Sequence, residues 1–145
     1  MNIKKPSQKK ISKKHINELK AETKCPVHPI FCFKSITSKD DYNFNFFNKD
    51  KSRKHEAAFY LIDKLRNLSK KSWEELLSLP KKTAYETLPM SIMNYNFGLG
   101  KDEKIISIRF GNGGAYRILG IKRYDCPIFD ILGFDFNHSS YNHGK

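Results

Sequence analysis

The sequence predicts an α+β fold in which a helix pair packs on a twisted antiparallel sheet that ends in a C-terminal three-stranded meander. Apolar residues recur at three- and four-residue spacing between residues 53 and 68, as on one face of a helix. Three later runs, 104–110, 115–123 and 128–136, have the length and apolar content of strands. Helices followed by strands in separate blocks indicate helices on one face of the sheet.

The chain length is that of one compact domain. It has 145 residues, of which 39% are hydrophobic, and it includes 11 Phe and 7 Tyr. We expect a basic N-terminal arm over residues 1–24 and a single α+β domain over residues 25–145. The prolines of Cys25-Pro26-Val27-His28-Pro29 separate the two, because they end any helix in the arm.

The helices have recognisable apolar faces and a start signal. The stripe predicted for the first helix consists of Ala58, Leu61, Ile62, Leu65 and Leu68. Ser72-Trp73-Glu74-Glu75 is a capping-box pattern, and it predicts a second short helix that ends at Pro80. Its expected buried residues are Trp73, Leu76 and Leu77.

The remaining segments are less regular. Residues 30–37 (IFCFKSIT) have the composition of a first strand, and residues 38–52 predict a loop or short strand with interleaved aromatic residues. Residues 81–103 are ambiguous and end in a loop rich in Asn and Gly. Gly111-Asn112-Gly113-Gly114 predicts a hairpin turn, because these residues tolerate positive φ. It lacks the Lys-Ser/Thr and the following helix of a phosphate-binding loop.

The register of this hairpin decides which side chains face each other. A symmetric Asn112-Gly113 loop pairs Arg109 with Tyr116. A three-residue loop with a bulge shifts the pairing by one residue and sets Arg109 opposite Arg117. Two like charges opposed in a sheet are destabilising, so that register indicates an anionic partner such as phosphate. The alternative is two exposed arginines at strand ends.

Positive charge is the strongest compositional signal. Lys and Arg number 27 against 15 acidic residues, a net charge of +12, and residues 1–24 contribute eight Lys and two Glu, so half of the net charge lies there. Such a balance favours contact with nucleic acid, although a Lys-rich, solvated surface gives the same composition. The candidate nucleic-acid-binding residues are Lys4, Lys5, Lys9, Lys10, Lys13, Lys14, Lys122 and Arg123.

The end of the chain carries residues suited to proton transfer. His138, Tyr141 and His143 follow the last predicted strand, and such side chains move protons during phosphodiester cleavage. The alternative is an ordinary polar tail. No metal and no cofactor are expected, because the spacing of Cys25, His28 and Cys32 matches no standard zinc site.

The chain has three cysteines, an odd and low number that is typical of a reducing compartment. It has no apolar run long enough to span a membrane, and no apolar stretch follows the first lysines as in a secretory signal. We therefore expect a cytoplasmic location and no membrane partner.

A helix pair followed by ISIRF, YRILGIKR and PIFDILGFD resembles the RelE/ParE-like toxin superfamily over about residues 53–143. Arg109, Tyr116, Arg117 and Tyr141 lie at positions that match the motif. The resemblance implies a basic toxin that cleaves mRNA, usually in the ribosome, and it implies an antitoxin protein as a partner. The first 50 residues and the segment 80–103 are longer than in that superfamily. The chain also has a looser resemblance to uncharacterised proteins of bacterial mobile elements, which implies no activity.

Three interpretations of the function follow from these observations. The first is a RelE-like, metal-independent mRNA endoribonuclease, in which Arg109 and Arg117 stabilise charge while Tyr141 with His138 or His143 moves protons. The alternative is a non-catalytic basic module from a mobile element, which binds nucleic acid or inhibits a host nucleoprotein. A module that binds an acidic protein is a third interpretation.

Overall fold

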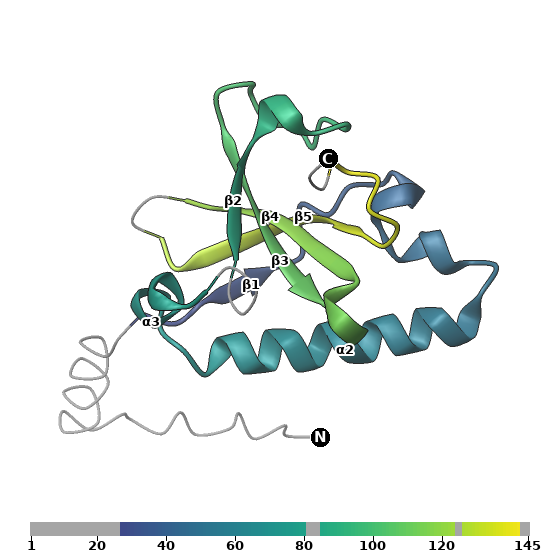
Figure 1. Ribbon diagram of the computed structural model, residues 1–145, viewed down its shortest axis with the longest axis horizontal. Helices are drawn as coiled ribbons and strands as arrows, with labels where there is room; N and C mark the ends of the chain where they lie inside the picture. The colour runs from purple at the N-terminus through teal and green to yellow at the C-terminus, as the bar shows by residue number, and fades with distance from the viewer. Residues whose placement is uncertain (1–26, 81–84, 124–125, 143–145) are drawn as a thin grey trace, which may run out of the picture.

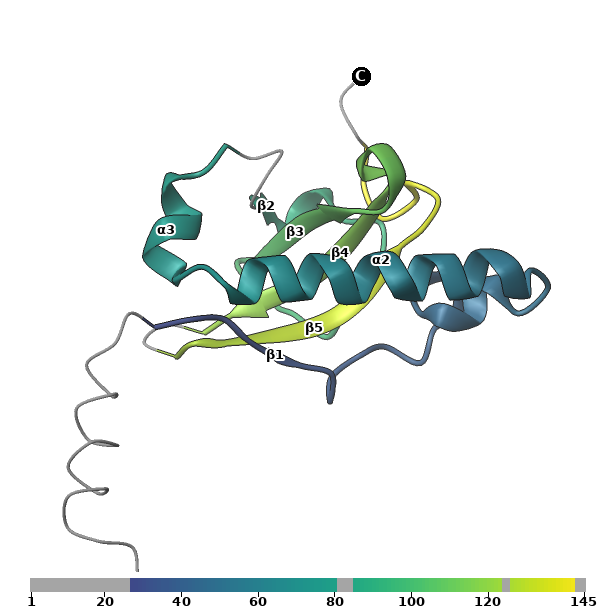
Figure 2. The same cartoon turned by 90° about the horizontal axis from the view of Figure 1, so that it is seen from below.

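The computed structural model describes residues 27–80, 85–123 and 126–142. They form a five-stranded sheet in the order β1-β5-β4-β3-β2, and the helix α2 lies across one of its faces (Figures 1 and 2). The strands are β1 (Ile30–Cys32), β2 (Glu86–Pro89), β3 (Lys104–Phe110), β4 (Tyr116–Lys122) and β5 (Ile128–Asp135). The helices are α2 (Lys51–Ser69) and α3 (Trp73–Ser78). The predicted α+β class and the C-terminal meander β3-β4-β5 are thus confirmed.

The sheet is mixed rather than wholly antiparallel. β2, β3, β4 and β5 pair antiparallel in turn, but β1 pairs parallel to β5, with Ile30 opposite Ile128. The topology permits this parallel pairing, because the whole helical segment and β2–β4 lie between β1 and β5 and supply the long connection that parallel strands need. β1 covers only Ile30–Cys32, so the strand predicted over 30–37 is shorter than expected.

The first predicted helix is present and starts slightly earlier than the apolar pattern. The side chain of Asp50 accepts a hydrogen bond from the backbone N–H of Arg53 and so caps the helix. Its buried residues are Ala57, Leu61, Leu65 and Leu68. The prediction for Ile62 was wrong: this side chain is 63% exposed, because the packed stripe begins at Ala57 and not at Ala58.

The capping box of the second helix is confirmed. The Ser72 side chain accepts from the Glu75 amide, and the Glu75 carboxylate accepts from the Ser72 amide. Trp73 and Leu76 are buried, and the Trp73 indole donates to the carbonyl of Pro127 at 2.9 Å. Leu77 was predicted to be buried but is 70% exposed, since a helix of one and a half turns buries only one narrow face.

The segments between these elements are short turns. Residues 38–52 contain two 3-10 turns, Asp40–Tyr42 and Phe44–Phe47. Phe44 packs against Phe134 of β5 and against Phe136, whereas Tyr42 stacks on Tyr95. The ambiguous segment 81–103 contains β2 and a 3-10 turn over Met90–Ile92.

Each face of the sheet has its own apolar cluster. Side chains of α2 and α3 pack with Ile106, Ile108, Ile118 and the phenylalanines of β5 on one face. On the opposite face Leu88, Ile105, Leu119 and Leu132 pack with Tyr141. The two sets alternate along β3 and β4, as the pleat requires. The C-terminal tail therefore covers the face that the helices leave open.

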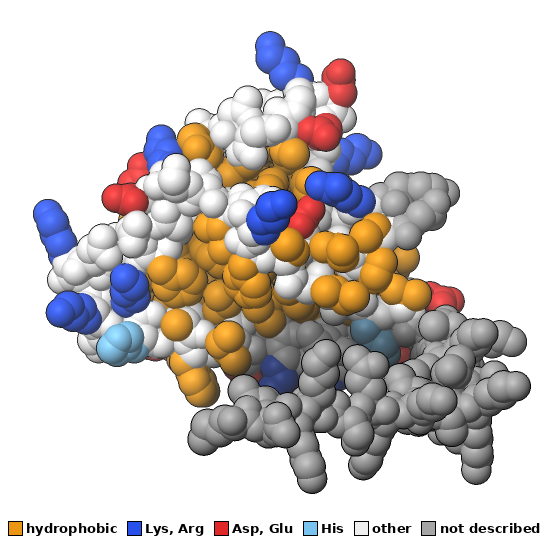
Figure 3. Space-filling model, turned by 180° about the vertical axis from the view of Figure 1, so that it is seen from behind, with side chains coloured by type: hydrophobic (Ala, Val, Ile, Leu, Met, Phe, Trp, Pro, Cys, Tyr) orange, Lys and Arg blue, Asp and Glu red, His pale blue; other side chains and the backbone are white. Residues whose placement is uncertain are grey.

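Charge does not form one sheet-wide patch on the side that Figure 3 shows. Seen from behind the view of Figure 1, hydrophobic side chains gather over the middle of the molecule and lysines and arginines lie mostly around their margin. On this face the cations therefore form no continuous patch.

Candidate nucleic-acid site

A cavity of about 420 Å³ lies on the sheet face opposite α2, where the C-terminal tail crosses the sheet. It joins residues from β2, β3 and β4 with the tail. The residues that line it are Glu86, Leu88, Ile92, Arg109, Arg117, His138, Tyr141 and Asn142. Polar side chains over an apolar floor, gathered from distant parts of the sequence, are typical of a binding site.

Two arginines form the cationic part of this cavity. The hairpin pairs Phe110 with Tyr116 and sets Arg109 directly opposite Arg117, so the second of the two predicted registers is the one present. The turn is longer than either predicted loop, because residues 111–115 separate the paired ends. Both arginines alternate with residues of the helix-side cluster and so project from the open face.

The two guanidinium groups are held differently. Arg117 is only 6% exposed, and its guanidinium donates hydrogen bonds to the backbone carbonyls of Gly114 and, at 3.0 Å, Tyr116. Arg109 is half-buried. Arg117 is thus a fixed positive charge at the base of the hairpin, and Arg109 stands opposite it at the edge of the cavity.

A buried carboxylate fixes the tail above these arginines. Asp135 lies opposite Arg117 in the β4–β5 ladder and is fully buried. It accepts hydrogen bonds from the amides of Asn137, Ser139 and Ser140 and from the Ser140 hydroxyl. Burial alone would raise the pKa of Asp135, but these donors outweigh it and lower the pKa below its ordinary value. The carboxylate therefore stays ionised and closes the turn that follows β5.

This turn carries His138 into the cavity. His138 is exposed and has a φ of 58°, so it adopts the left-handed conformation that few residues other than glycine take. Tyr141 follows and is buried, with its hydroxyl 3.3 Å from Ser107 Oγ and a backbone bridge to Met93. The tail is thus part of the folded core, and the imidazole position is defined by the turn.

Among the described residues, Glu86 is the one acidic residue that lines the cavity, and no pattern in the sequence selects it. It pairs with Ser107, two residues before Arg109 on the same face of β3. Such diagonal neighbours have side chains roughly 7–8 Å apart. The signal available in the sequence was the alternation Glu86-Thr87-Leu88, which is too short to indicate a strand by itself.

The other predicted site residues do not join the cavity. Lys122 lies over the Trp73 ring, 5.1 Å from its centroid, and Arg123 forms an ion pair with Asp130 at 3.4 Å. Both lie at the other end of β4 from Arg117. The remaining candidates fall outside the described residues: His143 and the arm lysines Lys4, Lys5, Lys9, Lys10, Lys13 and Lys14.

Within residues 27–80, 85–123 and 126–142, no group of three or more His, Cys, Asp or Glu side chains is placed to hold a metal ion. His28, which was weighed as a ligand, has its ring Nδ1 3.1 Å from the Ser69 carbonyl oxygen. In the same parts of the chain no helix is both long and apolar enough to cross a membrane.

Comparison with protein-family models, with curated proteins and with solved structures gives no match to this chain. The relation to the RelE/ParE-like superfamily therefore stays a prediction from the residues quoted above.

Proposed function

We propose that this chain is an endoribonuclease that cleaves RNA without a metal ion, by attack of a ribose 2′-hydroxyl on the adjacent phosphate. The observation that carries the proposal is the direct opposition of Arg109 and Arg117 in a cavity that also holds Glu86 and His138. Asp135 lies opposite Arg117 on its other side and balances part of that charge, so the arginine pair keeps a net positive charge that a bound phosphate bridges.

The arginines supply the electrostatic part of the reaction. Negative charge on the non-bridging phosphate oxygens grows as the 2′-oxygen attacks, and donors fixed in advance stabilise it without reorganising. Arg117, held by the carbonyls of Gly114 and Tyr116, is such a donor. Arg109 binds the same phosphate from the opposite strand, so the two clamp it from both sides.

Proton transfer falls to the carboxylate and the imidazole. Glu86 takes the proton of the 2′-hydroxyl as the 2′-oxygen–phosphorus bond forms, and protonated His138 gives a proton to the 5′-oxygen as its bond to phosphorus breaks. The products are a 2′,3′-cyclic phosphate and a 5′-hydroxyl. Tyr141, whose hydroxyl lies beside Ser107 Oγ, holds the tail in place rather than moving a proton.

The first experiment separates cleavage from binding. Purified full-length protein is incubated with end-labelled RNA in the presence of EDTA, and the fragments are resolved on a gel. We expect cleavage by the wild type, and losses of at least about 100-fold for Glu86→Gln and His138→Ala. Arg66→Gln removes a charge from an exposed position outside the cavity and is the control. RNA bound but left intact would refute the nuclease and support the binding module.

The cellular part of the proposal is a RelE-like toxin that acts on mRNA, with the ribosome and an antitoxin as partners. Regulated expression in a bacterial host tests it. We expect growth arrest and broken mRNA with the wild type and normal growth with Arg109→Gln. Equal growth of cells that express either protein would contradict the toxin role.

A further inference from the structure

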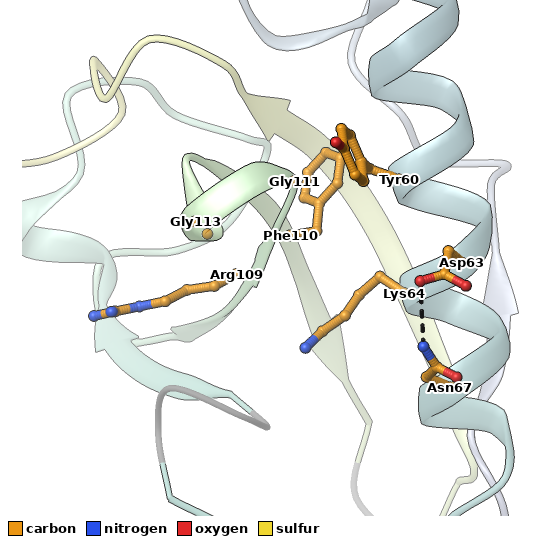
Figure 4. A pocket seen from close by; sticks show the side chains of 9 residues that line it. Tyr60, Asp63, Lys64, Asn67, Arg109, Phe110, Gly111 and Gly113 are labelled. Atoms are coloured by element: carbon orange, nitrogen blue, oxygen red, sulfur yellow. Dashed lines mark hydrogen bonds between the residues drawn. The ribbon is translucent and has the colours of Figure 1, made fainter.

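A second cavity, of about 330 Å³, lies between α2 and the β3–β4 hairpin (Figure 4). Tyr60, Asp63, Lys64 and Asn67 line it from the helix, and Arg109 with the glycines of the hairpin lines it from the sheet. The function proposed above makes no use of this space. Its composition, with two cationic side chains, one acidic side chain and a tyrosine, is nevertheless suited to a polar ligand that carries negative charge.

Arg109 connects this cavity to the first one. It lines both, because β2 pairs with β3 at Lys104–Ser107 and Arg109 lies beyond that ladder, at the edge of the sheet. A ligand that contacts Arg109 in the first cavity can therefore continue around this edge toward α2 without leaving the protein surface.

Lys64 brings a positive charge to the helix side of this cavity. It is half-buried, and in Figure 4 its side chain extends from α2 toward the strand that carries Arg109, whose guanidinium points away from the helix. Burial lowers the pKa of Lys64, which means that its ammonium group is partly removed from water. An anion near a partly desolvated ammonium interacts more strongly than at an exposed lysine.

The hairpin side of the cavity is backbone rather than side chain. Gly113 has a φ of 64° and a Cβ built on it would meet nothing within 4 Å, whereas one on Gly114 would meet Arg109 Cβ at 3.6 Å. The glycines thus leave room for a ligand to approach the chain closely, next to Arg109. The absence of side chains at these positions keeps the space open.

The far end of the cavity offers contacts for a flat polar ring. Tyr60 is half-buried and stands beside Phe110 in Figure 4, away from the arginine. The Asn67 amide donates to the Asp63 carboxylate at 3.4 Å, so a donor and an acceptor lie together about one to two turns from Tyr60 along the same helix. A base stacked on Tyr60 would be within reach of that pair.

We propose that the second cavity binds the nucleotide next to the cleaved phosphodiester of the same single-stranded RNA, with its phosphate at Lys64 and its base against Tyr60, while Arg109 binds the cleaved phosphate in the first cavity. The inference rests on the proposed function, because it takes RNA to be the ligand of the first cavity. It extends that function from one phosphate to a strand that crosses the sheet edge toward α2.

Binding of a fluorescent 2′-O-methyl RNA tetranucleotide, which lacks a 2′-hydroxyl nucleophile, tests this site separately from catalysis. We expect Lys64→Gln and Tyr60→Leu each to weaken binding by about fivefold or more. Lys64→Gln should also reduce the slope of log affinity against log salt by about 0.7, a change that a merely structural role would not produce. Arg66→Gln, on the same helix but outside the cavity, should bind like the wild type.

The outcomes separate the two proposals. If Lys64→Gln and Tyr60→Leu bind as tightly as Arg66→Gln, the second site is refuted, while cleavage by the wild type would leave the proposed function intact. If the tetranucleotide binds in a Lys64-dependent way but RNA is not cleaved, the site stands and the nuclease fails. If the wild type binds no RNA, both fail. Thermal unfolding of each variant identifies any that do not fold. If Tyr60→Leu does not fold, Lys64→Gln, at a half-buried surface position, still decides the test.

Discussion

Arg109 and Arg117 face each other directly across β3 and β4, and both line one cavity. Arg117 also holds the fold, because its guanidinium donates to the backbone carbonyls of Gly114 and Tyr116. We therefore expect Arg117 both to stabilise the fold and to bind the ligand, and Arg109 to bind the ligand only. This division makes their substitutions behave differently.

Arg109→Gln should lose RNA binding without losing stability. Removing one of two opposed like charges relieves repulsion, so we expect the free energy of unfolding to be unchanged or higher by up to about 1 kcal/mol. Arg117→Met should lower it by about 1–3 kcal/mol, because the part-buried carbonyls of Gly114 and Tyr116 lose their donor. Urea denaturation measures both. Equal destabilisation by the two variants would contradict the division of roles.

Asp135→Asn should change the acid stability of the fold. The folded-state pKa of Asp135 is lowered, so the carboxylate contributes stability above its unfolded pKa of about 3.9, and that contribution is lost as the pH falls through the folded-state value. At pH 7 we expect Asp135→Asn to cost about 1.5–3 kcal/mol, since hydrogen bonds to a charged acceptor are lost.

The same measurement below pH 4 provides the check. The wild type should lose stability there more steeply than Asp135→Asn, and the two denaturation curves should approach each other. A difference between them that is constant from pH 7 to pH 3 would show that the charge of Asp135 does not hold the tail.

Gly120→Ala should disrupt the sheet. The register between β4 and β5 shifts between Leu119 and Gly120, and a Cβ on Gly120 would meet the Asp130 carbonyl oxygen at 2.4 Å and the Phe129 ring at 2.6 Å. Because backbone cannot move aside cheaply, we expect a loss of about 3 kcal/mol, the upper end of the usual cost of overpacking. Gly100→Ala is the matched control, with its nearest atom at 3.8 Å, and should be near neutral in thermal unfolding. A folded, fully stable Gly120→Ala protein would refute the packing described at this bulge.

His138→Gly should separate the imidazole from the turn. Glycine adopts the φ of 58° more easily than histidine, so the variant should be as stable as the wild type or slightly more so. Cleavage should fall by about 100-fold or more if His138 donates the proton. Comparison of its thermal midpoint and cleavage rate with those of His138→Ala provides the check. Wild-type activity in His138→Gly would remove the imidazole from the mechanism.

The sequence alone was sufficient where one local pattern decides the structure. Helical spacing located α2, and the Ser72–Glu75 box located α3. The tail and hairpin residues Arg109, Arg117, His138 and Tyr141 were also selected, and the structure places all four in one cavity.

Other features depend on contacts that no local pattern encodes. The register that opposes the two arginines depends on how many residues form the turn, and glycine-rich loops permit several lengths. Glu86 was missed because β2 is four residues long and gains its identity only by pairing with β3. The parallel β1 likewise depends on where β5 lies.

The most direct test of the central claim is the chemistry of the RNA ends. Wild-type protein and RNA are incubated with EDTA, together with an RNA that carries a single 2′-deoxy residue at the preferred cleavage position, and the product termini are identified by mass spectrometry. We predict 2′,3′-cyclic phosphate and 5′-hydroxyl ends, no cleavage at the deoxy position, and intact RNA with Arg109→Gln. Ends with a 3′-hydroxyl, cleavage at the deoxy position, or no cleavage by the wild type would contradict the account.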